Sequence, residues 1–487
     1  MTVLPTSPSE LRAVWPEQLV LPDARSRIRS ANASSHSRVV VLDDDPTGSQ
    51  SVHGVPVLTR WSRADLEWAF AQPADGFFIL TNTRGLNDDE ARDTVLAVES
   101  ALSEVAAQTG QDYSLIARSD STLRGHYPLE TDVLIERAAA AGRPYDALLL
   151  APAYIAAGRV TAGDVHYVQE GDALVPVAET SYARDATFGF ESSDIRDYVE
   201  ERTRGGIPAS SVVSIGLEDI REGGPERVRD ILLGCSGAVP VVVNALDASD
   251  LDIVALGLLS AQEAGARVLC RTGPSFVASR LGIEPRRPLG VDEIFPQGDR
   301  PGHGLVVVGS HVELTTRQVA RLRADAPDLA VVEASVPRLL DPVTAEDELA
   351  SCESRIADGL RDGEVLLVTS REQIVAASGH DSLVIAQTVS SALVSLTRAA
   401  VATSPVRWVL AKGGITSSDT ATEGLGIRRA LVAGQLFDGI VSVWLNRSDD
   451  QDFLVGLPYI VFAGNVGDEA SLSEAVTVLR RPATPGA

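Results

Sequence analysis

The sequence has very little lysine and cysteine, and it is short of positive charge. Lys412 is the only lysine among the 42 basic residues, so chemistry that needs a primary amine on a side chain has one candidate. The three cysteines, Cys235, Cys270 and Cys352, lie far apart and form neither a disulfide framework nor a metal-binding motif. The formal net charge of -25 makes nucleic acids and anionic membranes unfavourable partners, because both repel an acidic surface.

Long apolar runs are missing too. No run approaches about 18 residues, the length that a membrane-spanning helix needs, and the N-terminal residues lack the basic and then apolar pattern of a secretory signal. The 44% of hydrophobic residues is nevertheless enough for sizeable cores, and 487 residues are enough for two large domains. These features predict a cytoplasmic protein with no membrane segment.

Strand-like and helical runs alternate along the chain from residue 38 onward, which predicts α/β domains with mostly parallel sheets. The alternation stops at residues 281–304, which hold four prolines, and then restarts. We therefore predict an N-terminal extension over residues 1–36, a domain over 37–280, a linking segment over 281–304 and a second domain over 305–487, with a cleft between the domains. The expected strands are 39–42, 77–80, 115–117, 147–150, 212–215, 241–243, 305–308, 365–369, 408–410, 439–443 and 459–462.

The most informative stretch follows the first expected strand. Val39 to Leu42 predicts a buried strand, the carboxylates Asp43 to Asp45 follow it, and Pro46 to Gly48 forces a turn. Ligands of open α/β sheets bind at the carboxyl ends of strands. Because adjacent anions repel one another, they need a cation, a metal or hydroxyl donors. The stretch therefore predicts a ligand site rather than a solvated turn.

Two further polar loops are expected in the first domain. Arg118 to Arg124 offers two guanidinium groups, one carboxylate and three hydroxyls after a strand, and arginine pairs bidentately with planar anions. Some of these hydroxyls could instead cap the following helix. The loop Gly158 to His166 adds Arg159 and His166, and this histidine could be either a general base or an ordinary buried side chain.

The second domain has loops of a different kind. Gly309 to His311, Gly413 to Ser418 and Ala463 to Gly467 each follow an expected strand and are rich in glycine or polar residues. Glycine lets backbone N–H groups approach a phosphate closely. None of the loops matches a P-loop or a dinucleotide-binding fingerprint, but three of them in one domain predict a nucleotide site. Carboxylates and arginines in one domain and phosphate loops in the other suit phosphoryl transfer.

A second hypothesis is a phosphatase. An apolar run followed by Asp43-x-Asp45-x-Thr47 resembles the nucleophile motif of haloacid-dehalogenase-like phosphatases, and Asn82 and Asp88 resemble their later motifs. The spacing does not fit, because Asp88 follows almost directly after Asn82, and the second domain would have no role. A third hypothesis is a nucleotide- or metabolite-binding regulator without catalysis.

Taken together, the motifs resemble the four-carbon acid sugar kinase family. Its Asp-Asp-x-Thr-Gly motif is matched by Asp44 to Gly48, its Asp-Ser-Thr-x-Arg-Gly motif by Asp120 to Gly125, and its Gly-Arg-x-Thr-x-Gly-x-x-His-Tyr motif by Gly158 to Tyr167. In the second domain, Ile415 stands where the family commonly has glutamate, and Phe462 stands where it commonly has lysine. The resemblance implies that the N-terminal domain binds a sugar acid and the C-terminal domain binds ATP.

The resemblance also implies a reaction: an ATP- and Mg²⁺-dependent kinase phosphorylates a terminal hydroxyl of threonate, erythronate or a 3-oxo-tetronate. Asp44 or Asp45 would accept the substrate proton or orient its hydroxyl, and Arg124 would hold the substrate carboxylate or the transferred phosphoryl group. Magnesium would bridge nucleotide phosphates with few direct protein ligands, and a homodimer is compatible with the sequence. The other expected substrate contacts are Thr47, Gly48, Asp120, Ser121, Arg159 and His166, and the expected nucleotide contacts are Ser310, Gly413, Gly414, Ile415, Thr416 and Gly464.

Overall fold

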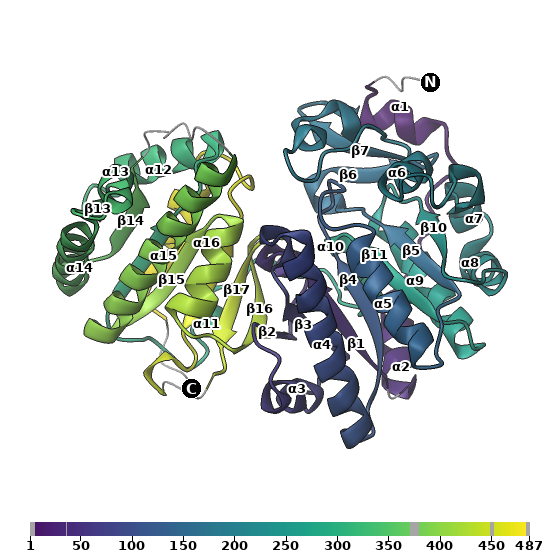
Figure 1. The fold of residues 1–487 in the computed structure, drawn as a ribbon, viewed down its shortest axis with the longest axis horizontal. Coiled ribbons are helices and arrows are strands. Elements are labelled where there is room, and N and C mark those ends of the chain that lie inside the picture. The colour runs from purple at the N-terminus through teal and green to yellow at the C-terminus, as the bar shows by residue number, and fades with distance from the viewer. Residues whose placement is uncertain (1–4, 36, 371–378, 449–451, 484–487) are drawn as a thin grey trace. The chain divides into compact units, whose positions relative to one another are not determined.

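The computed structural model describes residues 5–35, 37–370, 379–448 and 452–483. The chain divides into two compact units, Met1–Pro285 and Arg286–Ala487 (Figure 1). Each unit contains its own set of strands and helices. The α/β fold class expected from the sequence is therefore confirmed. The division falls inside the segment 281–304, and the finer domain boundaries given above stay predictions.

The first unit is built on a parallel sheet with the strand order β2-β3-β1-β4-β11-β5-β10-β9. Buried runs of Val, Ile, Leu and Phe form its central strands, as is usual where helices cover both faces of a sheet. The strands are β1 Ser37–Asp43, β2 Val55–Leu58, β3 Gly76–Leu80, β4 Asp112–Arg118, β5 Ala147–Ala151, β9 Val213–Ile215, β10 Val239–Val243 and β11 Val268–Thr272.

Helices α3, α4 and α5 form one hydrophobic core with the strands of the first unit. Helix α4 begins with a capping box between Asn87 and Glu90 and ends before Gly110, the C-cap residue, whose φ of 68° lies in the left-handed region that favours glycine. The helices of this unit are α1 Pro8–Ala13, α2 Ala24–Ser35, α3 Arg63–Phe70, α4 Asp88–Thr109, α5 Leu129–Ala140, α6 Ile195–Arg202, α7 Leu217–Arg221, α8 Gly224–Leu233, α9 Ala248–Glu263 and α10 Pro274–Arg280.

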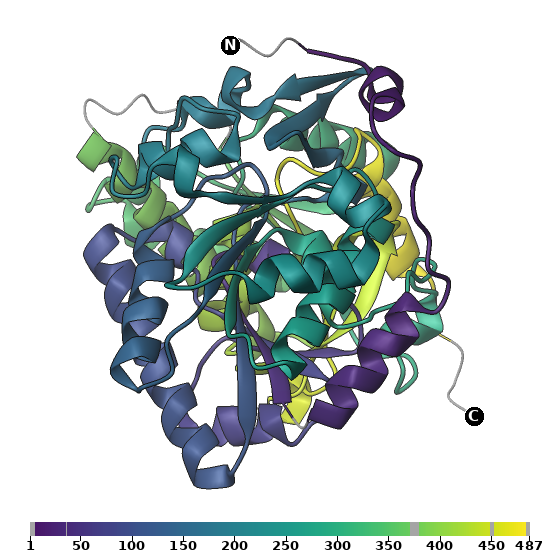
Figure 2. The same cartoon turned by 90° about the vertical axis from the view of Figure 1, so that its right-hand side faces the viewer.

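The N-terminal segment runs along the outside of the first unit, from α1 beside the small sheet to α2 at the lower edge (Figure 2). Thr6 pairs with Leu174 of β8, and Arg12 forms an ion pair with Asp247 at 2.5 Å. Ile28 of α2 is fully buried. The expected extension is therefore packed against the domain that follows it.

A small antiparallel sheet, β6 Arg159–Ala162, β7 Val165–Glu170 and β8 Ala173–Pro176, lies in the first unit beside the large one. The stretch from Gly158 to His166 was expected to be a loop, and this expectation was wrong. It forms β6, a tight turn and the start of β7. Gly163 and Asp164 have φ of 58° and 64°, the conformation that a two-residue hairpin turn requires.

The second unit has the strand order β13-β14-β12-β15-β18-β17-β16. Its strands are parallel from β13 to β18, whereas β17 runs antiparallel to both β18 and β16. The strands are β12 His303–Val308, β13 Ala330–Ala334, β14 Val365–Thr369, β15 Val406–Lys412, β16 Arg429–Phe437, β17 Ile440–Asn446 and β18 Pro458–Phe462, and the helices are α11 Val291–Ile294, α12 Glu313–Asp325, α13 Val336–Leu340, α14 Ala345–Asp362, α15 Gly379–Thr403, α16 Gly414–Asp419 and α17 Ser471–Arg480.

One segment of α15, Ile385–Thr403, is long and apolar enough to cross a membrane by length and composition alone. The sequence analysis gave no such run, because Gln, Ser, Thr and one Arg interrupt the apolar residues of this segment. Helix α15 contacts α13, α14 and α16 in the second unit. A helix of a protein core passes the same test, so this single segment is weak evidence for a membrane span.

Candidate active site

The carboxylates that follow β1 form an ion-pair network with arginines from the ends of the two neighbouring strands. Arg84, in the loop after β3, donates from Nη2 to Asp44 at 2.6 Å and from Nη1 to Asp45 at 3.3 Å. Arg118, the last residue of β4, donates from Nη1 to Asp43 at 2.8 Å and to Asp44 at 3.2 Å. Because β3, β1 and β4 are adjacent and parallel, their carboxyl ends meet at one edge of the sheet. Arginine thus supplies the counter-charge that the adjacent anions need.

The three carboxylates differ in access and in charge. The side chains of Asp43 and Asp44 are 4% and 3% exposed, whereas that of Asp45 is 16% exposed. Burial raises the pKa of Asp43 to about 7, although Arg118 opposes this shift. Burial also acts to raise the pKa of Asp45, but Arg84 and Arg118 outweigh it and leave this pKa below its ordinary value. Asp45 is therefore an ionised carboxylate that a ligand can reach.

Thr47 and Gly48 shape this carboxylate cluster. The backbone N–H and the hydroxyl of Thr47 donate to Asp45 Oδ1 at 2.8 and 2.5 Å. A Cβ atom at Gly48 would clash with the carboxylate of Asp43 and would lie 2.6 Å from Arg118 Nε. The turn therefore needs glycine at position 48 because the backbone passes so close to the ion pair.

The loop after β4 folds around Asp120. This buried carboxylate accepts hydrogen bonds from the backbone N–H of Thr122 at 3.2 Å, from the Thr122 hydroxyl, and from Arg124 Nε at 2.7 Å. Burial acts to raise the pKa of Asp120, but the surrounding arginines, Arg84 first among them, hold it far below its ordinary value. Asp120 therefore remains an anion that fixes the position of Arg124.

Two guanidinium groups meet over one aromatic ring. Arg124 and Arg159 lie 5.1 and 5.6 Å from the centroid of the Tyr182 ring, within the range of a cation–π interaction. Arg159 also donates from Nη1 to the hydroxyl of Ser121 at 2.7 Å, and Arg124 lies 3.5 Å from Asp185. The two cations are thus gathered in one place by Tyr182, a residue in no motif that the sequence analysis used.

His166 lies behind this loop and is fully buried. Its Nε2 is 2.7 Å from the carbonyl of Ser121 and its Nδ1 is 2.9 Å from the hydroxyl of Thr161. Because a carbonyl can only accept, Nε2 carries the proton. Burial lowers the pKa of His166 to about 4, so the ring is neutral near pH 7. This geometry does not fit the expected substrate contact, because both ring nitrogens are used to hold the loop.

Two more charged residues, which the sequence analysis missed, are buried next to the cluster. Arg271 of β11 lies 5.0 Å from the centroid of the Tyr127 ring, and its Nη2 has no hydrogen-bond partner within the described ranges. Glu130 of α5 accepts from the Thr83 hydroxyl at 2.6 Å, and burial raises its pKa. A Cβ atom at Gly125 would lie 3.6 Å from Arg271 Nη2. No spacing in the sequence links these residues, because each comes from a different element.

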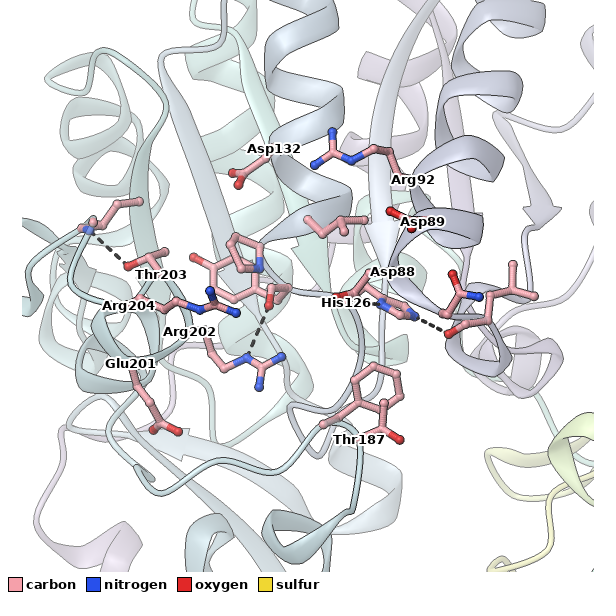
Figure 3. Close-up of a pocket in the computed structure, with 18 residues that line it drawn as sticks. Asp88, Asp89, Arg92, His126, Asp132, Thr187, Glu201, Arg202, Thr203 and Arg204 are labelled. Atoms are coloured by element: carbon pink, nitrogen blue, oxygen red, sulfur yellow. Dashed lines mark hydrogen bonds and ion pairs between the residues drawn. The ribbon is translucent and has the colours of Figure 1, made fainter. Parts of the chain in front are cut away.

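A groove of about 1370 Å³ opens between the start of α4, the segment from His126 to Leu129 and residues 201–207 (Figure 3). Its polar walls carry both signs of charge, and His126 there lies 2.8 Å from Asp88. None of the residues expected to bind substrate lines the groove. We therefore place the candidate site at the carboxylate–arginine cluster rather than in this groove.

In the second unit, the three glycine-containing loops converge on Ser310. They follow β12, β15 and β18, which are adjacent and parallel. A Cβ atom at Gly413 would lie 3.2 Å from Ser310 Cβ, and a Cβ atom at Gly464 would lie 2.6 Å from Ser310 Oγ. The Thr315 hydroxyl donates to the carbonyl of Gly464 at 2.9 Å. Glycine at these positions lets the backbones meet closely enough to form a cradle.

The other expected nucleotide contacts lie at the same loops. Thr416 is next to this cradle, since its hydroxyl would clash with a Cβ atom at Gly309. Gly414 begins α16, and the Ile415 side chain that follows it is 56% exposed. Because this side chain has no polar atom, Ile415 offers only its backbone for polar contacts. Within the described part of the chain, no group of three or more His, Cys, Asp or Glu residues is suited to hold a metal ion.

The fold and these two clusters define the class of protein: a two-domain α/β protein with a carboxylate–arginine cluster in one domain and a glycine-loop cradle in the other. Two family models match it. The sugar-binding N-terminal domain matches residues 39–280, and the nucleotide-binding C-terminal domain matches residues 305–472. The chain belongs to the four-carbon acid sugar kinase family, which confirms the family that the motifs indicated.

Individual relatives are distant. A D-erythronate kinase from Heliobacterium modesticaldum is 25% identical over 347 residues, which are 69% of this chain and 72% of that protein. A Salmonella typhimurium LT2 structure described as a putative tRNA synthase has 19% identity and a TM-score of 0.64, and covers 90% of this chain and 98% of its own. A Haemophilus influenzae protein structure has 17% identity and a TM-score of 0.57, with 90% and 99% covered. The two structures support the fold alone.

Proposed function

We propose that the chain is an ATP-dependent kinase that phosphorylates a terminal hydroxyl of a four-carbon sugar acid of the threonate, erythronate or 3-oxo-tetronate type. The observation that carries the proposal is Asp45, the ionised and reachable carboxylate beside Arg84. It lies in the domain that the sugar-binding model matches. The resemblance to a D-erythronate kinase supports the proposed substrate class.

Asp45 orients the substrate hydroxyl and accepts its proton. Its lowered pKa makes it a weak base, which is sufficient because phosphoryl transfer depends mainly on positioning and charge stabilisation. Arg124 and Arg159 bind the substrate carboxylate, since a planar guanidinium matches a carboxylate better than an ammonium does. Asp44, Thr47, Gly48, Asp120, Ser121 and His166 hold these groups in place.

The glycine loops of the second domain hold the phosphates of ATP. The backbone N–H groups around Ser310, Gly413 and Gly464 and the hydroxyl of Thr416 are the groups available to them. Magnesium, when bound with the nucleotide, supplies the positive charge that phosphoryl transfer needs, and it is held mainly by the phosphates.

The phosphatase hypothesis finds less support in the same geometry. Its nucleophile would be Asp43, which is 4% exposed and paired with Arg118 at 2.8 Å. With a pKa of about 7, this carboxyl is also partly protonated at neutral pH. A side chain so enclosed is a poor nucleophile for an external phosphate ester.

An ADP-release assay over a panel of four-carbon acids tests the proposal. We expect turnover with at least one acid that depends on ATP and Mg²⁺. Release of phosphate from a phosphorylated acid without nucleotide would instead support the phosphatase. Acid and nucleotide binding by calorimetry without any turnover would support the regulator that has lost catalysis.

A further inference from the structure

The single lysine of the chain lies inside the second domain, at the glycine loops. Lys412 is the last residue of β15 and directly precedes Gly413, and its side chain is fully buried. Its Nζ donates to the carbonyl of Ala463 at 3.0 Å, and Ala463 directly precedes Gly464. The amine therefore lies between two of the three loops that form the cradle.

The immediate surroundings of this amine are apolar. In the sheet, Lys412 is level with Val308 of β12 on one side and with Phe462 of β18 on the other. Its Nζ lies 3.7 Å from the centroid of the Phe462 ring. A carbonyl and an aromatic face stabilise an ammonium only in part, and a buried charge without a counter-ion is strongly unfavourable.

No carboxylate within the described ranges pairs with Lys412. The titratable groups on the elements packed around it are bonded elsewhere: Asp419 of α16 accepts from Ser390, and Tyr459 of β18 donates to the Ser417 carbonyl at 2.5 Å. His311, in the loop after β12, lies 3.3 Å from the Thr369 hydroxyl. Burial alone lowers the pKa of Lys412, to about 7.

An apolar side chain would fill this position at lower cost, because replacing a buried charge with a well-packed hydrophobic residue is often neutral or stabilising. A buried amine beside a phosphate cradle is explained if an anion arrives there. Nucleotide phosphates are such anions, and a nearby negative charge favours the charged form of an amine.

We propose that Lys412 is the cation of the nucleotide site, which takes up a proton from solvent as the nucleotide phosphates bind and returns it when they leave. This inference rests on the proposed nucleotide-binding function. Lys412 has one pKa in the free protein and a higher pKa in the complex. Between these two values, each rise of one pH unit weakens nucleotide binding by up to about tenfold, because one proton is linked to binding. Below the free pKa the amine is already charged, and this dependence disappears.

Because the chain has one lysine, a tag-free protein labelled with [ε-¹³C]lysine gives one side-chain signal. In the free protein we expect this signal to titrate near pH 7. With saturating Mg·ADP its titration should move upward by at least one pH unit, whereas adenosine, which has no phosphate, should leave it unchanged. If Mg·ADP binds and the titration stays where it was, the inference is wrong.

Calorimetry of Mg·ADP binding at pH 6.5 and pH 8.5, in buffers of different ionisation enthalpy, gives the number of protons taken up. At pH 8.5 the wild-type protein should take up more protons than Lys412→Met. Subtracting the uptake of the variant from that of the wild-type protein cancels the protons that ADP itself binds or releases. At pH 6.5, Lys412→Met should bind Mg·ADP about tenfold more weakly, as loss of a charge-assisted hydrogen bond predicts. The exposed Arg361→Met in the same domain is the matched control.

The outcomes separate this inference from the proposed function. If the wild-type protein binds neither Mg·ADP nor Mg·ATP, the proposed nucleotide site fails and the inference fails with it. If it binds both, and proton uptake is the same in the wild-type protein and in Lys412→Met, only the inference fails. If Lys412→Met does not fold, the lysine signal of the wild-type protein decides alone.

Discussion

Three consecutive carboxylates have three different environments in this protein, and the difference lies in what each side chain touches. Asp43 is enclosed by Arg118 and the turn at Gly48, and Asp44 is held by two nitrogens of Arg84. Asp45 shares the same arginine but remains partly exposed. The sequence alone could not tell which of Asp44 and Asp45 is the base. The exposure of each carboxylate depends on the strands beside it, and the sequence does not show which strands are neighbours.

Replacing Asp45 with asparagine is the most direct test of the proposed base. The amide oxygen can still accept from Thr47, but the negative charge and the proton acceptor are lost. We expect kcat to fall by about 100-fold or more, which is typical of the loss of a general base, while the circular dichroism spectrum stays unchanged. Asp172→Asn, at an exposed position after β7, should have wild-type kinetics. Near-normal turnover in Asp45→Asn together with its loss in Asp44→Asn would assign the role to Asp44.

The two arginines around Tyr182 should determine recognition of the acid. Lysine at position 124 or 159 keeps the positive charge but loses the planar pair of donors. For either variant we expect KM for the acid to rise about tenfold, roughly the value of one charge-assisted hydrogen bond, with little change in KM for ATP.

Steady-state kinetics with each substrate varied in turn make this measurement, and Arg63→Lys on the exposed side of α3 is the control. A fall in kcat with an unchanged KM for the acid would mean that the arginine contacts the transferred phosphoryl group instead. If both kinetic constants stay at wild-type values in Arg124→Lys, its pair with Asp120 has only a structural role.

At the scale of elements, long apolar runs predicted strands well, whereas short or charged strands were missed. Residues 39–42, 147–150 and 365–369 fall within β1, β5 and β14, because uninterrupted runs of Val, Ile and Leu suit a strand that is covered on both faces. Strand β11 was missed, since Arg271 breaks its pattern. That charge is tolerated because the guanidinium packs on Tyr127, a contact between distant parts of the sequence.

The candidate site shows the same limit. Motif reasoning found the residues that follow β1 and β4, because a strand end rich in polar groups is visible in one stretch of sequence. Arg84 and Tyr182 come from other elements, and only the parallel register of the sheet and the packing of the segment around residue 182 bring them to the same place. The hairpin of β6 and β7 was read as a loop because its turn residues outweighed its short strands.

The link between that hairpin and the loop after β4 predicts a pH effect on stability. His166 has a pKa of about 4 in the folded protein and about 6.5 when unfolded. Between these values the unfolded chain binds a proton that the folded chain does not, so the free energy of unfolding falls as the pH falls. The slope is at most about 1.4 kcal/mol per pH unit for one group.

Urea unfolding at pH 7 and pH 5 measures this effect in the wild-type protein and in His166→Gln. Glutamine can still donate to the Ser121 carbonyl but does not titrate. We expect the wild-type protein to lose more stability between the two pH values than the variant does. Equal losses would show that His166 titrates normally in the folded state.

At the scale of the whole molecule, each domain has its own hydrophobic core and its own cluster of candidate site residues. The two family models follow the same division. In the proposed function, sugar-acid recognition depends on carboxylates and guanidinium groups in the first domain, whereas nucleotide recognition depends on backbone groups and Lys412 in the second. Two cores and two sets of contacts predict that either ligand can bind without the other.

A valine at position 464 tests this division of labour. A Cβ atom there would lie 2.6 Å from Ser310 Oγ and 3.3 Å from Ser310 Cβ, so a branched side chain displaces the Ser310 side chain and fills part of the phosphate cradle. Calorimetry should show ATP binding weakened by about tenfold or more, equivalent to about 1.4 kcal/mol, while binding of the acid keeps its wild-type affinity. Gly363→Val places the same side chain in the same domain with nothing within 4 Å of its Cβ, and it should bind both ligands normally. If Gly464→Val lost the acid and kept ATP, the two ligands would have been assigned to the wrong domains.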